Sequence, residues 1–230
     1  MVRTRRWLAA GCLAAAALLA GCANEYPNTV FNHTSDVNIA IDHLFDRMFL
    51  LGTIVFIGVE AALIYTVIKF RRREGQQEPR HVHGNTTIEI LWTVIPAVIL
   101  VFLAVPTVRT IFRTQAKAVT GALQVEVIGH QWWWEFRYPQ YTRTLPGGKL
   151  DTLVTANELY IPAGRTVNFA LKTADVLHSF WIPRLGGKRD LISNRTNYLW
   201  FTPDSSLGTN AFNGSCNEYC GTSHANMRFR

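Results

Sequence analysis

The chain has 230 residues, of which 48% are hydrophobic and 17% charged, so it is too apolar to be disordered. This length allows one globular domain in addition to membrane-spanning segments. The formal net charge of +7 often indicates binding to nucleic acid or to an anionic surface. Much of this charge, however, lies in two short runs, 3–6 and 71–73, that flank apolar stretches. The distribution indicates membrane topology, and we expect no nucleic-acid partner.

Residues 1–21 are typical of a bacterial lipoprotein signal peptide. A basic stretch through Arg6 precedes an apolar core and the sequence Leu-Ala-Gly-Cys, which ends at Cys22. Cleavage before Cys22 would leave that cysteine acylated outside the inner membrane, whereas an ordinary signal peptide would contain it only by chance. Under either interpretation residues 22–47 are exported.

Two apolar stretches, 48–70 and 88–108, are each long enough to cross a bilayer as a helix. The connection near 71–87 carries the Arg71–Arg73 cluster, so the positive-inside rule places it in the cytoplasm. Residues 48–110 are therefore predicted to form a transmembrane hairpin, with both outer ends on the exported side. Glu60, inside the first span, is predicted to contact a partner helix, because an ionisable residue is costly in lipid.

Residues 111–230 have the alternating pattern of short strands separated by turns. Predicted strands cover 123–128, 157–162 and 166–171, and a Pro-Gly turn ends the second of them. The fold class is therefore an α+β membrane protein, with a helical hairpin followed by a β-sandwich or barrel. Residues 228–230 look like the start of another strand, so we expect this domain to continue beyond Arg230.

The most informative motif combines two cysteines, two histidines and a methionine. Thiolate, imidazole and thioether ligands favour copper, although zinc competes for the thiolates and imidazoles. One cysteine would suffice for a mononuclear blue-copper site, so a second thiolate could bridge a second metal. The alternative is a disulfide, which forms readily in an oxidising compartment. The residues are His178, Cys216, Cys220, His224 and Met227.

At these residues the chain resembles subunit II of the cytochrome c oxidases, which holds a dinuclear copper centre (CuA) in a cupredoxin-like domain. The resemblance also covers the helical hairpin and the segment 129–136, Gly-His-Gln-Trp-Trp-Trp-Glu-Phe. It implies that Cys216 and Cys220 bridge both coppers. It assigns His178 and Met227 to one copper, and His224 with the backbone carbonyl of Glu218 to the other.

The resemblance implies further roles for three side chains. The Glu218 carboxylate would reach a magnesium ion at the boundary with subunit I, which suits a hard ligand. Trp132 would be the exposed ring through which cytochrome c delivers electrons, although each ring of the Trp132–Trp134 run could equally pack into the core. Glu89 would lie at the mouth of a proton-uptake channel, or would simply stabilise the start of the second helix.

The function implied is electron entry into a respiratory oxidase of the bacterial inner membrane. Electrons from a separate or fused cytochrome c would pass through copper to haem in subunit I, where oxygen reduction is coupled to proton pumping. A quinol oxidase subunit lacks the copper ligands, and a copper chaperone needs no membrane hairpin. A nitric oxide reductase subunit stays open as an alternative. The turn at 192–195 departs from the family's proline-glycine turn, and no metal role is expected for five further histidines, His33, His43, His81, His83 and His130.

Overall fold

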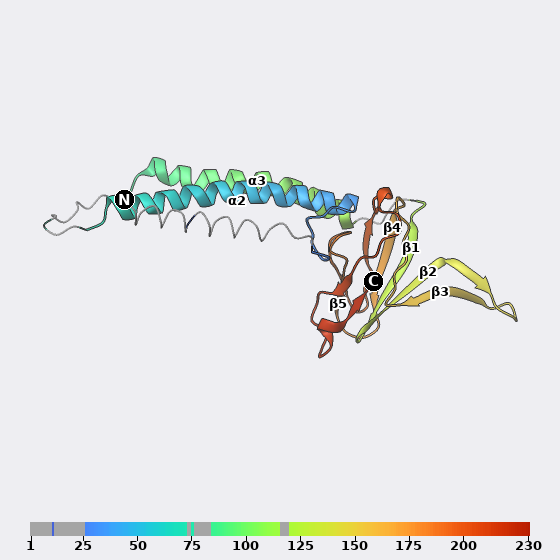
Figure 1. Cartoon of the computed structure of the whole chain (residues 1–230). Coiled ribbons are helices and arrows are strands. Elements are labelled where there is room, and N and C mark those ends of the chain that lie inside the picture. Colours follow the sequence, from blue (N-terminus) through green and yellow to red (C-terminus); the bar gives the residue numbers. More distant parts are fainter. Residues whose placement is uncertain (1–10, 12–25, 73–74, 76–83, 116–119) are drawn as a thin grey trace.

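The computed structural model describes residues 11, 26–72, 75, 84–115 and 120–230. Two long helices lie side by side and carry a β-domain at one end, as Figure 1 shows. Apart from Gly11, the predicted signal peptide lies outside the described residues, as do Cys22, His81, His83 and most of the connection predicted to be cytoplasmic. The predicted α+β class, with a helical hairpin followed by a β-sandwich, is confirmed.

Helix α2 (Asp36–Lys69) covers the first predicted apolar stretch except Phe70 and begins before it, and helix α3 (Thr86–Gln115) contains the second and extends beyond it. Both are long and apolar enough to cross a membrane. At 1.5 Å per residue, α2 is about 51 Å long, whereas the hydrocarbon core of a bilayer is about 30 Å thick. The helix begins at Asp36, twelve residues before the predicted apolar stretch. The preceding residue, Ser35, caps it, because its side chain accepts a hydrogen bond from the backbone N–H of Asn38.

The β-domain consists of two sheets. The larger has the order β3-β2-β1-β4-β7, and only its β1–β4 pair is parallel. Its strands are β1 (Leu123–His130), β2 (Trp133–Thr144), β3 (Leu150–Ala156), β4 (Val167–Thr173) and β7 (Asn197–Phe201). The smaller has the order β6-β5-β8-β9, with β5 (His178–Trp181), β6 (Arg189–Leu191), β8 (Gly214–Cys216) and β9 (Arg228–Phe229).

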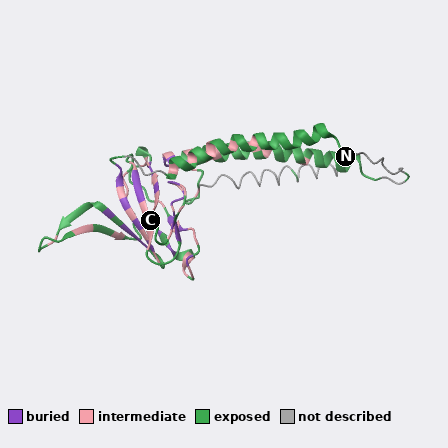
Figure 2. Cartoon of the chain, turned by 180° about the vertical axis from the view of Figure 1, so that it is seen from behind, coloured by how far each residue is buried: buried purple, intermediate pink, exposed green. Residues whose placement is uncertain are grey.

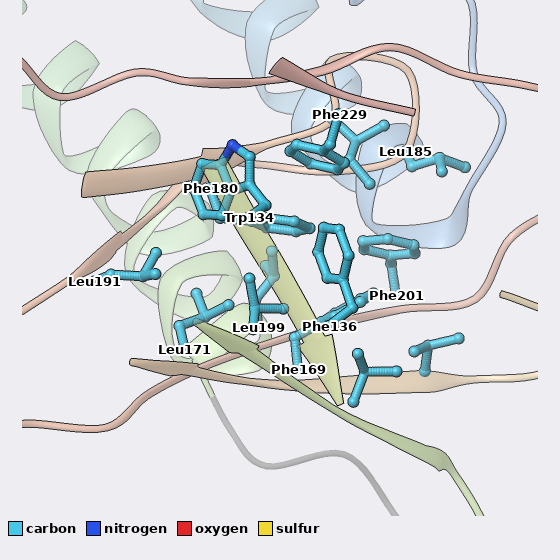
Figure 3. Close-up of a cluster of buried hydrophobic side chains, with 14 of the residues drawn as sticks. Trp134, Phe136, Phe169, Leu171, Phe180, Leu185, Leu191, Leu199, Phe201 and Phe229 are labelled. Atoms are coloured by element: carbon cyan, nitrogen blue, oxygen red, sulfur yellow. The ribbon is translucent and has the colours of Figure 1, made fainter. Parts of the chain in front are cut away.

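Aromatic side chains from both sheets form the core of the β-domain (Figure 3). Phe180 of the smaller sheet stacks on Phe229 with a centroid separation of 5.0 Å and meets Trp134 and Phe169 of the larger sheet at 5.7 and 5.4 Å. Such pairs stabilise a core beyond the area that they bury. Phe180 follows His178 by two residues, so the core also fixes the strand that presents the first candidate ligand.

The start of α2 is attached to the β-domain by polar contacts. The Asp36 carboxylate accepts a hydrogen bond of 2.8 Å from the backbone N–H of Thr202, and the Asn38 amide donates to the carbonyl oxygen of Pro183. At the end of α3, the Trp200 indole donates to the carbonyl oxygen of Arg113. Both helices therefore hold the sandwich directly at one end of the hairpin.

Two sequence predictions about the loops meet different outcomes. The predicted strand at 157–162 is wrong, because residues 157–162 belong to no strand and β3 instead ends at Ala156. The predicted turn after them is present, with Gly164 at a φ of 71°. The turn at 192–195 forms with Asn194 at a φ of 60°, and asparagine is among the residues that tolerate this left-handed conformation.

Candidate metal centre

Cys216 ends strand β8 and Cys220 lies in the loop that follows it. Their sulfur atoms are 3.8 Å apart. Both are buried, and neither forms a disulfide among the described residues. A disulfide would bring the sulfurs to about 2.05 Å, whereas metal–thiolate bonds of about 2.3 Å let one ion bind both at the observed separation. The geometry therefore favours metal binding by the two thiols over the disulfide alternative.

The other predicted ligand atoms surround these two sulfurs. His178 Nδ1 lies 3.8 Å from Cys216 Sγ, and His224 Nδ1 lies 3.6 Å from Cys220 Sγ. Met227 Sδ is 3.8 Å from Cys220 Sγ, and the Glu218 carbonyl oxygen is 3.2 Å from Cys216 Sγ. The residues that the sequence motif singled out therefore come together, although His178 is 38 residues before Cys216 in the chain.

The two thiols differ in their acidity when no metal is bound. Burial raises the pKa of Cys216, but hydrogen bonding with His178 and with the backbone of Glu218 and Ser179 outweighs it and lowers the pKa to about 6. Burial and the neighbouring Cys216 charge raise the pKa of Cys220 to about 12. At neutral pH the pair therefore holds one proton, which metal binding to both sulfurs would release.

Asp175 and Gln131 support the cluster from outside and were missed by the sequence analysis. The Asp175 carboxylate lies 2.8 Å from His178 Nε2 and accepts a 2.7 Å hydrogen bond from the backbone N–H of Gln131. Burial raises the Asp175 pKa, but these hydrogen bonds outweigh it and lower the pKa below its ordinary value. The carboxylate thus turns Nδ1 of His178 toward the sulfurs. The position of Asp175, three residues before His178, is the sequence feature that could have identified it as a partner of that histidine.

Gly129 leaves the space that the His178 ring occupies. A Cβ atom at position 129 would lie 2.7 Å from His178 Cδ2 and 3.2 Å from Leu191 Cδ2. Since the ring is fully buried, it has little room to move away.

Replacing Gly129 with alanine is expected to displace the His178 imidazole and to weaken copper binding by about 10- to 100-fold, as other losses of ligand orientation do. Copper titration with a competing chelator measures this. The control is Gly52→Ala, where the added Cβ meets nothing within 4 Å. Wild-type affinity in the Gly129 variant would show that the imidazole shifts without loss of the site.

The three consecutive tryptophans have three different environments. Trp134 is fully buried in the core, whereas Trp132 and Trp133 are each 37% exposed. Trp133 stacks on the His130 ring at a centroid separation of 4.2 Å. The Trp132 indole instead donates a 3.1 Å hydrogen bond to the carbonyl oxygen of Cys220. Of the three rings, Trp132 therefore joins the solvent-exposed surface to the cysteine loop.

The glutamates with predicted roles lie in separate places. The backbone of Glu218 faces Cys216, but its side chain belongs to no group of potential metal ligands among the described residues. Glu89 lies in the first turn of α3, after Asn85, whose side chain accepts hydrogen bonds from two backbone N–H groups. That end of the hairpin is remote from the β-domain (Figure 1). Glu60 is partly exposed in the middle of α2.

The fold and the site together define a class of protein. It is membrane-anchored, because two membrane-length helices carry the β-sandwich, and its clustered thiol, imidazole and thioether groups form a candidate soft-metal centre. Residues 26–110 match the family model for the transmembrane domain of cytochrome c oxidase subunit II, and residues 123–229 match the model for its periplasmic domain. The chain belongs to the cytochrome c oxidase subunit II family.

Similar curated proteins agree with this assignment. The chain is 39% identical to cytochrome c oxidase subunit 2 of Alkalihalophilus pseudofirmus over 81% of its own length and 54% of that protein. It is 40% identical to the homologue from Bacillus sp. strain PS3 over 70% of its length and 46% of that protein. A probable subunit 2 from Rickettsia bellii is 34% identical over 79% of this chain and 70% of that protein. The chain therefore spans about half the length of the first two relatives.

Proposed function

We propose that this chain is the electron-entry subunit of a respiratory cytochrome c oxidase. It accepts single electrons from cytochrome c at a dinuclear copper centre and passes them to haem in subunit I. The observation that carries the proposal is the convergence of two unbonded cysteine sulfurs, two imidazole nitrogens and a thioether in one cluster. Copper held there would supply reversible one-electron chemistry.

The cluster suits two soft ions sharing both sulfurs. Cys216 and Cys220 would bridge, with His178 and Met227 on one copper and His224 with the Glu218 carbonyl oxygen on the other. His178 Nδ1 lies 3.8 Å from Cys216 Sγ and His224 Nδ1 lies 3.6 Å from Cys220 Sγ, so each sulfur has an imidazole nitrogen close to it. A fully buried methionine supports copper over zinc, because structural zinc sites use thiolates and imidazoles.

Burial and backbone hydrogen bonds constrain much of this cluster. His178 and Met227 are fully buried, and the backbone N–H of Cys216 donates to the carbonyl oxygen of Met227, which ties the two ends of the loop together. The Gln131 side chain donates a 2.7 Å hydrogen bond to the carbonyl oxygen of Cys220. A ligand frame fixed in this way changes little when an electron arrives, which favours rapid transfer.

Trp132 is the proposed point of electron entry, because its indole is partly exposed and hydrogen-bonded to Cys220. Trp132→Phe is expected to slow reduction by cytochrome c at least about tenfold, the effect typical of an interface hot spot, while copper content stays unchanged. Stopped-flow reduction and metal analysis measure the two quantities. Trp133→Phe is the matched control, since that ring is equally exposed but stacks on His130. Copper loss in the Trp132 variant would instead make the ring structural.

The remaining parts of the proposal concern the assembly. The two helices would span the bacterial inner membrane, with the β-domain on the outer face and Glu89 near the cytoplasmic surface at a proton-uptake channel of subunit I. The Glu218 side chain would bind magnesium with groups from subunit I. Oxygen would be the final acceptor, and proton pumping would take place in the partner subunits.

Electron paramagnetic resonance of the detergent-extracted complex, with metal analysis on the same sample, tests the copper centre. The expected spectrum is the hyperfine pattern of one electron shared equally by two copper nuclei. A single-copper pattern would indicate a blue-copper carrier. Intact protein with zinc or without metal would reject the relay.

A further inference from the structure

The carbonyl oxygen of Cys220 accepts two hydrogen bonds from the turn between β1 and β2. The Gln131 amide donates one at 2.7 Å, and the Trp132 indole donates the other at 3.1 Å. A carbonyl oxygen has two lone pairs, so both are used here. Cys220 is only 3% exposed, and buried carbonyl groups need such partners. The two side chains therefore fix the orientation of the peptide group that follows a candidate bridging cysteine.

Gly221 allows both donors to approach this peptide group. Its φ of 116° lies in the left-handed region, which residues with a side chain rarely adopt. A Cβ atom at this position would lie 3.1 Å from Gln131 Nε2 and 3.1 Å from Trp132 Cζ2. Both side chains thus lie against the backbone between Cys220 and Gly221. The cysteine loop and the turn are therefore shaped to fit each other at this contact.

Gln131 also connects the cysteine loop to the histidine of β5. Its backbone N–H donates a 2.7 Å hydrogen bond to Asp175, whose carboxylate lies 2.8 Å from His178 Nε2. One residue therefore links the supports of two candidate ligands, His178 and Cys220, that are distant in the chain. Residues 131–133 are exposed, whereas the adjoining residues of β1 and β2 are buried or half-buried (Figure 2), so the two strands hold the turn in place.

We propose that Gln131 is a positioning residue that sets the reduction potential of the copper centre through the Cys220 peptide group. This inference rests on the proposed function, because it concerns the same copper site. The Gln131 N–H directs the positive end of its dipole toward the residue of a bridging sulfur, which disfavours the more positive, oxidised cluster. By fixing Cys220 relative to His178, Gln131 also favours equal sharing of one electron between the two metals.

Gln131→Leu removes the donor and leaves a side chain of similar bulk. We expect it to lower the equilibrium constant for reduction of the copper centre about threefold, which corresponds to about 28 mV for one electron. The hyperfine pattern of the two coppers is expected to become unequal, while the copper content stays that of the wild type. Potentiometric titration of the intact complex, followed by electron paramagnetic resonance with metal analysis, measures all three quantities.

Two further variants separate hydrogen bonding from packing. Gln131→Lys keeps a donor of similar reach, so it is expected to retain the equal hyperfine pattern and a reduction potential no lower than that of the wild type. Gln124→Leu is the matched control, because the Gln124 amide at the other end of β1 also donates to a backbone carbonyl, that of Ala122, at 3.2 Å. This control should match the wild type in reduction potential and in spectrum.

The outcomes distinguish this inference from the function on which it rests. Wild-type potential and spectrum in Gln131→Leu would overturn the positioning role. Equal changes in the leucine and lysine variants, including equal loss of copper, would also overturn it, because packing at position 131 would then explain them. In each case the electron-entry function would stand. A wild-type complex that has no dinuclear copper spectrum would overturn both.

Discussion

Cys216→Ser is expected to abolish the proposed dinuclear copper spectrum and to lower electron uptake by more than about 100-fold. Loss of an indirect partner of a ligand already costs about 10- to 100-fold in metal affinity, and Cys216 is a proposed direct ligand. A serine hydroxyl stays protonated at neutral pH and is a hard donor, whereas the Cys216 thiol, with a pKa lowered to about 6, is ionised. Metal analysis and electron paramagnetic resonance of the purified complex provide the measurement.

Ser223→Ala is the matched control for this loss. Ser223 lies in the same loop, just before the short 3-10 helix η3 (His224–Asn226), and its side chain makes no capping hydrogen bond there. We expect this variant to keep the copper content and spectrum of the wild type. If the Cys216 variant retained the shared-electron spectrum, Cys216 would not be a bridging ligand, and the proposed arrangement of the centre would be incorrect.

The sequence could predict that the candidate ligands lie close together because most of them are close in the chain. Cys216, Cys220, His224 and Met227 lie within twelve residues, so a single loop can bring them together whatever the rest of the fold. His178 is distant in sequence, and only its resemblance to the family motif placed it with the loop. The structure supplies the physical reason, since β5 pairs with β8 and aligns Phe180 with Cys216.

Residues that leave room for a ligand or orient it are harder to predict from sequence than the candidate ligands themselves. Gly129 has no side chain to attract notice, yet its missing Cβ makes room for His178. Asp175 has an ordinary carboxylate, and its role depends on a 2.8 Å contact with one particular ring nitrogen. Neither role can be inferred from composition or spacing. Each depends on how strands β1 and β4 lie beside residues 175–178.

Strand and helix boundaries show the limits of pattern analysis. Hydropathy measures the apolar length of a helix, so it predicted a start at Met48, whereas the Ser35 cap and the contact between Asp36 and Thr202 set the observed start. Alternation at 157–162 predicted a strand, but the backbone there has other partners. Leu159 N–H donates to the Arg230 carbonyl oxygen, and Asn157 N–H donates to that of Trp134, so this segment links the sheets without joining either one.

Phe180→Ala is expected to destabilise the β-domain by about 3–5 kcal/mol, the usual cost of removing a buried phenylalanine ring. Phe180 is fully buried and contacts aromatic rings of both sheets, as Figure 3 shows, so the cavity would lie where the two layers meet. For a domain of this size the apparent melting temperature should fall by about 10–20 °C. Thermal unfolding of the copper-loaded complex, followed by near-ultraviolet circular dichroism, measures the shift.

The same substitution links the core to the metal centre. Phe180 lies opposite Cys216 in the β5–β8 pair and two residues after His178, so loss of its packing should loosen both ligands and speed copper release to a chelator. Leu153→Ala, on the exposed β2–β3 hairpin, should change stability by no more than about 0.5 kcal/mol and leave copper release unchanged. A Phe180 variant that melts early but releases copper at the wild-type rate would show that the loop of Cys216–Met227 holds its metal independently of the sandwich core.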